Sequence, residues 1–333
     1  MSYNVKACTT SKSLEKIKIL LENQGLIFED KVTHTIGVYD QDQLVATGSL
    51  YENVIKMIAI DQNYQGENLT ATVMTALVQK LHEQRIEKYF LFTTPKNESI
   101  FKPFSLSLIL KNDDIVLFEN DVETITEKLA SINQKLNLNK GQTAAIVMNC
   151  NPVTYGHLYL IRMCSMENEN VIIFLVEENK SIFPFDVRYN LLKMATKDFE
   201  NVHIVPSTQY IISRATFPTY FLKELNAASR AFMRLDIAIF MKYFMPIFKI
   251  DKRYVGEEPL DATTNAYNET MKEMLQDRLV IVKRLEHDGS AVSASRVRKM
   301  ALHHDLHGIK EIVPTSTYKF LKSKKGLALF DDK

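Results

Sequence analysis

The stretch Thr143–His157 reads TAAIVMNCNPVTYGH, and it decides how the second half of the chain folds. Its first six residues, Thr143–Met148, are almost all small or apolar, as expected of a buried strand. Polar and turn-forming residues follow, and they end at Gly156 and His157, where a helix begins. We therefore predict that this helix starts at the carboxyl edge of a parallel sheet, where α/β proteins bind ligands.

The residues after His157 continue this alternation of strand and helix. We expect helices at 156–166 and 185–197, and strands at 171–176 and 202–205. This βαβαβ order is the signature of a Rossmann-like, doubly wound parallel sheet. The remaining predicted elements are a helical region at 218–244, strands at 253–255 and 279–282, and helices at 264–277, 293–304 and 315–322.

The residues before Thr143 have a different pattern, with strands in succession. Strands at 34–39 and 44–50 flank a turn and predict an antiparallel hairpin. The other elements expected there are strands at 54–60, 89–93 and 115–118, and helices at 69–84 and 122–136. We predict a mixed α/β domain at 1–136, a linker at 137–142 and a second α/β domain at 143–333.

The composition is that of a globular protein with about two domains, since single cores rarely exceed ~250–300 residues. The 333 residues carry 41 Lys+Arg against 40 Asp+Glu, which excludes a basic nucleic-acid surface over the whole protein. Three cysteines without CxxC spacing argue against a disulfide scaffold or a zinc ribbon and fit a reducing cytoplasm. The N-terminus lacks the apolar core of a signal peptide, and we expect no membrane span.

The start of the helix after Thr143–Met148 suits a phosphate group. Free amides and the positive end of the helix dipole attract anions there, and Gly156 allows a close approach to the backbone. Thr154 and His157 lie three residues apart, so both can face one ligand and stabilise charge on a phosphoryl group. The alternative is an ordinary helix cap with a partly buried histidine.

A second anion site is predicted at the start of the helix at 293–304. Ser293 is suited to cap that helix, and Ser295 and Arg298 lie three residues apart. Hydroxyl groups beside a guanidinium group offer planar, bidentate contacts to a phosphate. The alternative is a capped surface helix whose arginine is merely solvated.

Together these two segments resemble the nucleotidyltransferase superfamily whose hallmark is His-x-Gly-His, with Thr154 in place of the first histidine. A lysine-bearing loop at 179–185 also matches. Residues 215–223, ATFPTYFLK, and 253–259, RYVGEEP, are more specific and resemble the citrate lyase ligase family. The resemblance covers nearly the whole chain.

This resemblance implies an AMP-forming acid–thiol ligase. Acetate would be activated by ATP and Mg²⁺ to acetyl-adenylate, with pyrophosphate released. The acetyl group would then pass to the thiol of the dephospho-coenzyme A-type prosthetic group on the acyl carrier subunit of citrate lyase. Implied catalytic residues are Thr154, His157, Lys180 and Arg298, and implied nucleotide-binding residues are Asn151, Gly156, Gly256, Ser293, Ser295 and Arg298. Arg188 and Arg214 are candidates for binding acetate or the carrier arm, and no protein cage for the metal is expected.

The N-terminal region resembles an N-acetyltransferase domain of the GNAT type. Residues 65–70, QGENLT, parallel its pyrophosphate loop, so Gln65 and Gly66 are candidates for binding a coenzyme A-like arm. Asn68 and Thr70 stand where that fold has small residues, which favours an altered pocket over acetyl transfer. A purely structural role is the alternative.

Two other functions remain open from sequence. One is a cofactor-biosynthetic adenylyltransferase of the pantetheine-phosphate or nicotinamide-nucleotide type, and the other is a GNAT acyl-coenzyme A-binding protein or acetyltransferase. The histidines at 303, 304 and 307 are interpreted as a solvated face and not as a metal site. Cys150 is interpreted as a small residue packed under the loop.

Overall fold

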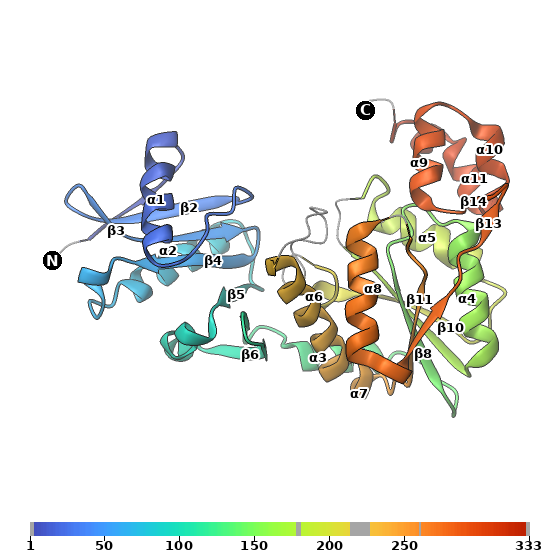
Figure 1. Cartoon of the computed structure of the whole chain (residues 1–333), viewed down its shortest axis with the longest axis horizontal. Helices are drawn as coiled ribbons and strands as arrows, with labels where there is room; N and C mark the ends of the chain where they lie inside the picture. The colour runs from blue at the N-terminus through green and yellow to red at the C-terminus, as the bar shows by residue number, and fades with distance from the viewer. Residues whose placement is uncertain (1–2, 178–180, 214–226, 260, 331–333) are drawn as a thin grey trace. The chain divides into compact units, whose positions relative to one another are not determined.

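The computed structural model describes residues 3–177, 181–213, 227–259 and 261–330. The chain forms two compact units, Met1–Ile125 and Thr126–Lys333. Figure 1 shows their elements coloured along the chain. The division falls before the predicted domain end at residue 136, so it assigns helix α3, Ile125–Asn133, almost wholly to the second unit. No helix within the described ranges is long and apolar enough to cross a membrane.

The first unit contains a seven-stranded sheet in the order β1-β2-β3-β4-β5-β7-β6. Its neighbouring strands are antiparallel except β4 and β5, whose parallel pairing joins only Val54 to Phe90 and Ile55 to Leu91. A parallel pair needs a crossover connection, and helix α2 lies within it. The strand bounds are β1 Asn4–Ala7, β2 His34–Asp40, β3 Gln43–Tyr51, β4 Val54–Ile60, β5 Phe90–Thr93, β6 Leu106–Lys111 and β7 Val116–Asn120.

Two helices of the first unit pack on the sheet through separate apolar clusters. Helix α2, Leu69–Glu83, agrees with its prediction and packs closely, since a Cβ at Gly48 would lie 2.6 Å from the Val73 side chain. Helix α1, Ser11–Asn23, buries Ile17, Leu20 and Leu21 in the other cluster. Helix α1 and strands β1 and β6 were not predicted from the sequence.

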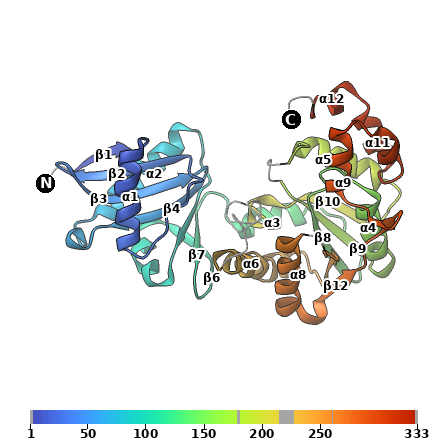
Figure 2. The ribbon, with the colours of Figure 1, turned by 45° about the horizontal axis from the view of Figure 1, so that its top comes forward.

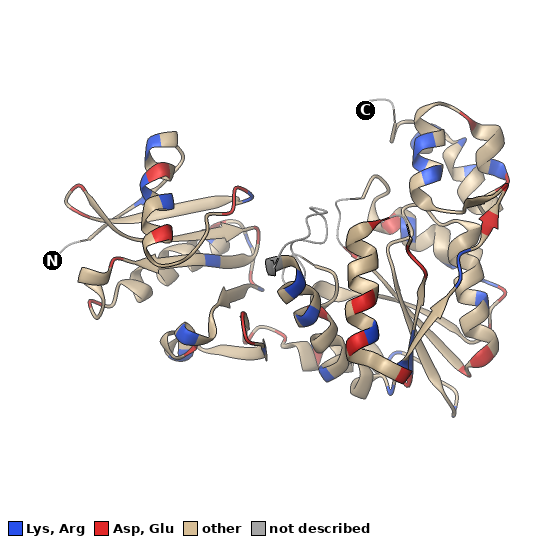
Figure 3. Ribbon diagram, viewed as in Figure 1, with Lys and Arg blue, Asp and Glu red and all other residues tan. Residues whose placement is uncertain are grey.

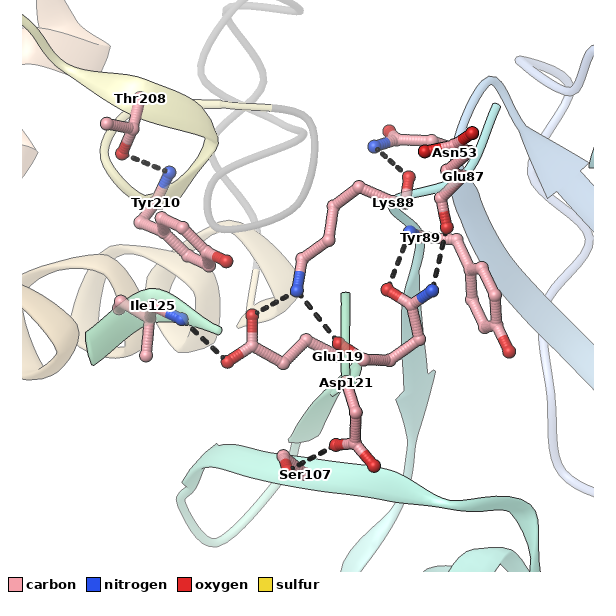
Figure 4. Close-up of polar contacts among 11 residues, drawn as sticks. Asn53, Glu87, Lys88, Tyr89, Ser107, Glu119, Asp121, Ile125, Thr208 and Tyr210 are labelled. Carbon is pink, nitrogen blue, oxygen red and sulfur yellow. Dashed lines mark hydrogen bonds and ion pairs between the residues drawn. The ribbon is translucent and has the colours of Figure 1, made fainter. Parts of the chain in front are cut away.

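A buried polar cluster fixes the end of β7 against β5 (Figure 4). Lys88 Nζ lies 2.7 Å from Glu119 Oε2 and donates to Asn120 O at 2.9 Å. The other carboxylate oxygen of Glu119 accepts the backbone N–H of Ile125 at 2.9 Å. Glu119 is only 1% exposed, so its charge is neutralised by an ion pair and a hydrogen bond inside the unit.

The second unit contains a five-stranded parallel sheet in the order β10-β9-β8-β11-β12. The first strand, β8, lies in the centre, and the order extends from it in both directions, which confirms the doubly wound fold. The strand order changes direction between β8 and β11, although all the strands are parallel, and ligands bind at the carboxyl edge of such a switch point. The bounds are β8 Thr143–Met148, β9 Asn170–Leu175, β10 Val202–Pro206, β11 Lys252–Gly256 and β12 Leu279–Val282.

Helices cover both faces of this sheet (Figures 1 and 2). Helices α4, α5, α9 and α11 contribute to one apolar core, and the other face packs Phe174 against Phe240, Phe244 and Phe248 at centroid distances of 5.2–6.4 Å. The bounds are α4 Tyr155–Glu167, α5 Phe185–Ala195, α6 Ala227–Ile239, α7 Met245–Ile247, α8 Ala262–Leu275, α9 Ala294–Leu302, α10 Leu306–Lys310, α11 Thr315–Leu321 and α12 Lys324–Leu327.

The predicted helical region at 218–244 is described only from residue 227 onward. There, α6 passes into a π-helical turn, Phe240–Phe244, and then into α7. A small hairpin of β13, Glu286–His287, and β14, Ser290–Ala291, precedes α9 and was not predicted. Its turn contains Gly289 at φ +67°, a conformation that glycine adopts readily.

Candidate functional site

The loop between β8 and α4 is held by a buried arginine. Arg188 has no exposed surface, and its Nη1 atom donates to Val176 O at 2.6 Å and Asn149 O at 2.9 Å. Its Nε atom donates to Phe183 O at 3.0 Å. These bonds tie together the segments that follow β8 and β9. Arg188 therefore has no surface left for acetate or a carrier arm, and that expectation is wrong.

Thr154 and His157 form a hydrogen-bonded pair at the start of α4. The backbone N–H of Thr154 donates to His157 Nδ1 at 3.0 Å, and Thr154 Oγ1 lies 2.8 Å from the same nitrogen. A backbone N–H can only donate, so Nδ1 must be an unprotonated acceptor. The neutral ring then carries its proton on Nε2, and the pair fixes this tautomer.

The environment of His157 keeps its ring neutral. Thr154 is fully buried and His157 is partly buried. Burial, followed by the positive charge of Arg284, lowers the pKa of His157 to about 4. At neutral pH the ring is therefore an uncharged hydrogen-bond donor, suited to a phosphate oxygen and not to proton transfer from a charged imidazolium.

Gly156 joins the two predicted anion-binding segments. A Cβ atom at this position would lie 2.6 Å from the carbonyl oxygen of Val292, which is the residue before the N-cap of α9. Only glycine lets the first turn of α4 approach that backbone so closely. The start of α4 therefore lies directly against the segment that leads into α9, as a common ligand for both segments requires.

Arg298 connects the same two segments through its guanidinium group. Its Nη2 atom donates to Ser295 Oγ at 3.0 Å, and its Nη1 atom donates to Asn151 O at 2.6 Å. Ser293 caps α9 by accepting the N–H of Arg296 at 3.1 Å. Arg298 is only partly exposed, and burial lowers its pKa from an ordinary arginine value. Asn151 Oδ1 in turn accepts the N–H of Phe183 at 3.1 Å.

Two further charged residues flank this site at the carboxyl ends of β11 and β12. Arg284 Nη2 lies 2.6 Å from Glu258 Oε2, and both side chains are largely buried. Glu258 lies in the segment RYVGEEP at 253–259, but no function was predicted for it or for Arg284, because nothing local in the sequence marks either residue. Gly256, at the end of β11, has no atom within 4 Å of where a Cβ would stand, so space is open beside it.

Some predicted residues lie elsewhere or outside the described ranges. Lys180, Arg214 and residues 215–223 fall outside the described residues, so their predicted roles remain predictions. Cys150 is 1% exposed and belongs to the apolar core, and burial raises the pKa of its thiol, in line with a packing role. Across the described part of the chain, no three His, Cys, Asp or Glu side chains are grouped to hold a metal ion.

In the first unit, Gln65 and Gly66 lie in the exposed loop before α2. Gly66 has φ +95°, and nothing lies within 4 Å of where its Cβ would stand. The backbone of Asn68, the N-cap of α2, has the left-handed conformation at φ 58°, and its side chain makes no capping hydrogen bond. Gln65 and Gly66 thus lie beside a helix start, as predicted. The cap of this helix has no side-chain hydrogen bond like the one that fixes His157 to Thr154 at the start of α4.

The second unit has the features of the nucleotidyltransferase-like class, whose ligands bind at helix starts on the carboxyl edge of a parallel sheet. A family model described as the citrate lyase ligase C-terminal domain matches residues 143–321. The chain belongs to the citrate lyase ligase family.

Similar full-length relatives support this assignment. The chain is 34% identical over 318 residues to the [citrate [pro-3S]-lyase] ligase of Klebsiella pneumoniae, covering 92% of each chain. It is 31% identical over 321 residues to that of Escherichia coli K12, covering 94% of this chain and 91% of the relative. Among solved structures, an acyl-CoA N-acyltransferase from Pseudomonas aeruginosa matches 36% of this chain and 98% of its own, with 15% identity and TM-score 0.30.

Proposed function

We propose that this chain is an AMP-forming ligase that activates acetate with ATP and acetylates the carrier subunit of citrate lyase. The relatives that support the proposal carry the name [citrate [pro-3S]-lyase] ligase and align along almost their whole length. The observation that carries the adenylation site is the neutral His157 of α4, held beside the Ser295–Arg298 pair of α9.

In the first step, a carboxylate oxygen of acetate attacks the α-phosphorus of ATP. The bond between the α-phosphorus and the bridging oxygen breaks, and pyrophosphate leaves. His157 donates from Nε2 to an α- or β-phosphate oxygen, and Thr154 holds the ring in that tautomer. Ser293, Ser295 and Arg298 bind the departing pyrophosphate, and Lys180 supplies additional positive charge. Asn151, Gly156 and Gly256 shape the backbone around the nucleotide.

In the second step, the carrier thiolate attacks the carbonyl carbon of acetyl-adenylate. A carbon–sulfur bond forms, the bond to the phosphate oxygen breaks, and AMP leaves, while the thiol proton passes to solvent. A nucleoside phosphate is a good leaving group, so the site needs only to position the thiol and exclude water.

We propose that Mg²⁺ enters with ATP as part of the substrate. Magnesium keeps most of its water and binds phosphate oxygens readily, so it neutralises charge on the triphosphate without a dedicated protein cage. Gln65 and Gly66, at the start of α2, are proposed to bind the diphosphate of the carrier's dephospho-coenzyme A-type arm. Cys8, Cys150 and Cys164 are free thiols, which suits an enzyme of the reducing cytoplasm.

The decisive test measures each step with the purified full-length chain. Acetate-dependent exchange of labelled pyrophosphate into ATP reports adenylation, and release of AMP that requires both acetate and the carrier thiol reports the complete reaction. Propionate and butyrate, assayed in parallel, define the acid that is accepted.

Another outcome would assign a different function. Pyrophosphate exchange that depends on pantetheine phosphate or nicotinamide mononucleotide, and not on acetate, would make the chain a cofactor-biosynthetic adenylyltransferase. Tight binding of acetyl-coenzyme A without any ATP turnover would instead favour an acyl-coenzyme A-binding protein.

A further inference from the structure

The C-terminal helices α9–α12 carry an uneven share of the chain's positive charge. Residues 294–333 contain nine lysines and arginines against four acidic residues, whereas the whole chain has 41 against 40. The rest of the molecule is therefore net acidic. Basic segments recur along α9 and the helices packed beside it (Figure 3). Such a concentration of one sign of charge marks a surface that attracts a partner of the opposite sign.

The charges lie on the outer surface of these helices. We define the basic cap as its six exposed lysines, which are Lys299, Lys310, Lys319, Lys322, Lys324 and Lys325. Lys319 on α11 and its C-cap residue Lys322 are exposed, whereas Thr317 and Leu321 of the same helix are buried. Lys322 Nζ lies over the ring of Tyr318 at 5.5 Å, and none of the six forms an ion pair with another described residue.

The two acidic residues of this segment that lie within the described ranges do little to neutralise the cap. Asp305 is engaged as the N-cap of α10, where its carboxylate accepts the N–H of Gly308 at 3.0 Å. Glu311 is exposed on the short connection between α10 and α11. The basic cap is therefore available to an acidic surface brought from outside the chain.

The basic cap is also continuous with the adenylation site. Helix α9 begins with Ser295 and Arg298 at that site, and Lys299 is the next residue. The N–H of Tyr155, the first residue of α4, donates to Ile312 O at 3.0 Å, so the α10–α11 connection is anchored to the same helix start. A partner that docks on these helices would present its reactive group next to the site.

We propose that the basic cap is the docking surface for the acyl carrier subunit, which meets it with acidic side chains. This inference rests on the proposed function, in which the carrier must bring its thiol to acetyl-adenylate. Rim charges of this kind mainly raise the association rate, and their effect is screened by salt. The cap therefore sets the affinity for the carrier and leaves adenylation unaffected.

The test replaces three lysines of the cap together, as Lys319→Glu, Lys322→Glu and Lys324→Glu. The control triple is Lys135→Glu, Lys140→Glu and Lys272→Glu, which are exposed lysines near the amino edge of the same sheet. We expect the cap triple to raise the KM for the carrier roughly tenfold or more at low salt, and the control triple to change it less than about twofold. Acetate-dependent ATP–pyrophosphate exchange stays at the wild-type rate in both.

Three measurements separate this inference from the proposed function. A wild-type chain without acetate-dependent exchange would refute the proposed function, whatever the cap does. Exchange that is intact with an unchanged carrier KM in the cap triple would overturn the docking surface alone. Acetylation of free dephospho-coenzyme A must also be unaffected, because an equal loss with this small thiol would assign the lysines to the arm and not to the carrier protein.

A milder series keeps the test valid should the triple fail to fold, as judged by circular dichroism. Single Lys→Ala variants at 319, 322 and 324 should each raise the carrier KM by a smaller factor, and the differences from wild type should shrink between ~50 and ~200 mM salt. Salt-independent values equal to wild type would overturn the proposal. Saturable binding of a random oligonucleotide that is lost in the triple, with the carrier KM unchanged, would also overturn it.

Discussion

The loops before α2 and α4 occupy equivalent places in the two units, yet they are built differently. Each follows a strand that pairs in parallel with a neighbour, and each leads into a helix start. Before α4, Gly156 lies against Val292 O, and His157 is tied to Thr154. Before α2, Gly66 faces open space, and the N-cap side chain makes no capping bond.

This difference shows what the proposed anion site at α4 has beyond a helix start. Amide groups and a glycine occur at many helix starts and attract any anion weakly. At α4, a second segment is packed against the first and a guanidinium group spans both, so several donors are held at fixed positions before a ligand arrives. At the α2 loop nothing packs against Gly66 and the N-cap side chain makes no capping bond, which suits recognition of a diphosphate but not stabilisation of a transition state.

The largest effect is expected from His157→Ala. Removing one preorganised donor should lower acetate-dependent ATP–pyrophosphate exchange by about 10²–10⁴-fold, with a much smaller change in ATP affinity. Exchange assays and ATP titrations of the same preparation measure both. His82→Ala, an exposed histidine of α2, is the matched control. Near-wild-type exchange in His157→Ala would make the α4 loop no more catalytic than the α2 loop.

Stability should depend on pH through the same histidine. Its pKa is about 4 in the folded chain and about 6.5 when unfolded, so the unfolded chain binds more protons between these values. Stability is therefore lost as the pH falls, by about 2 kcal/mol between pH 7 and pH 5 from this residue.

Urea unfolding of wild type and His157→Asn at both pH values measures that contribution. Burial also lowers the pKa of His34 and His203, so wild type loses stability from three histidines, and only the difference between the two chains reports His157. Equal losses in both chains would show that the ring is not held neutral.

A smaller effect is expected from Arg298→Lys. Lysine keeps the positive charge but cannot donate to Ser295 Oγ and Asn151 O at once, so exchange should fall about tenfold. Arg296→Lys, two residues away, is the control, since its guanidinium group contacts only His287 O among the bonds described. Full activity of Arg298→Lys would show that exchange needs only a positive charge at residue 298 and not the two hydrogen bonds of the guanidinium group.

The smallest effect on exchange is expected from removal of the first unit. A shortened chain of residues 126–333 retains α3 from its second residue onward and all proposed adenylation residues, and Asn133 Nδ2 of α3 donates to Ile247 O at 2.9 Å. Exchange should stay within about twofold of wild type, whereas carrier acetylation should fall if the Gln65–Gly66 loop holds the arm.

A second shortened chain sharpens this result. Residues 139–333 lack α3 and should be less stable than residues 126–333, since the bond to Ile247 is lost. Equal loss of exchange and acetylation in the longer version would show that the two units work together. Full carrier acetylation would leave the α2 loop without the proposed role.

The parallel sheet could be predicted because its strands are buried on both faces. Thr143–Met148 and Asn170–Leu175 are continuous apolar runs, and polar loop residues separate them from the helices. Strand β1 gave no such signal, since all four of its residues are exposed on the sheet edge. Helix α1 did carry a signal, with a cap at Thr10 and buried Ile17, Leu20 and Leu21, but its lysines obscured the apolar pattern.

The two ends of the candidate site were predictable, whereas its connections were not. Thr154, His157 and Arg298 could be found because helix starts concentrate functional groups at short spacing. Arg188 also lies near a helix start, and the sequence alone does not distinguish it from Arg298. In the structure, Arg188 donates to the backbone carbonyl oxygens of Phe183, Asn149 and Val176. The pairing of Arg284 with Glu258 joins two loops that only the folded sheet brings together.

The three buried cysteines can report local opening of the structure, because a buried thiol reacts only when the segment that covers it opens. Cys150 lies in the loop between β8 and α4 and its side chain is almost wholly covered, as are those of Cys164 on α4 and Cys8 in the first unit. A thiol reagent cannot reach Cys150 until this loop opens, so the labelling rate of Cys150 measures how often the loop opens. Any ligand that holds the loop closed would lower the labelling rate of Cys150 and leave the labelling rate of Cys8 unchanged.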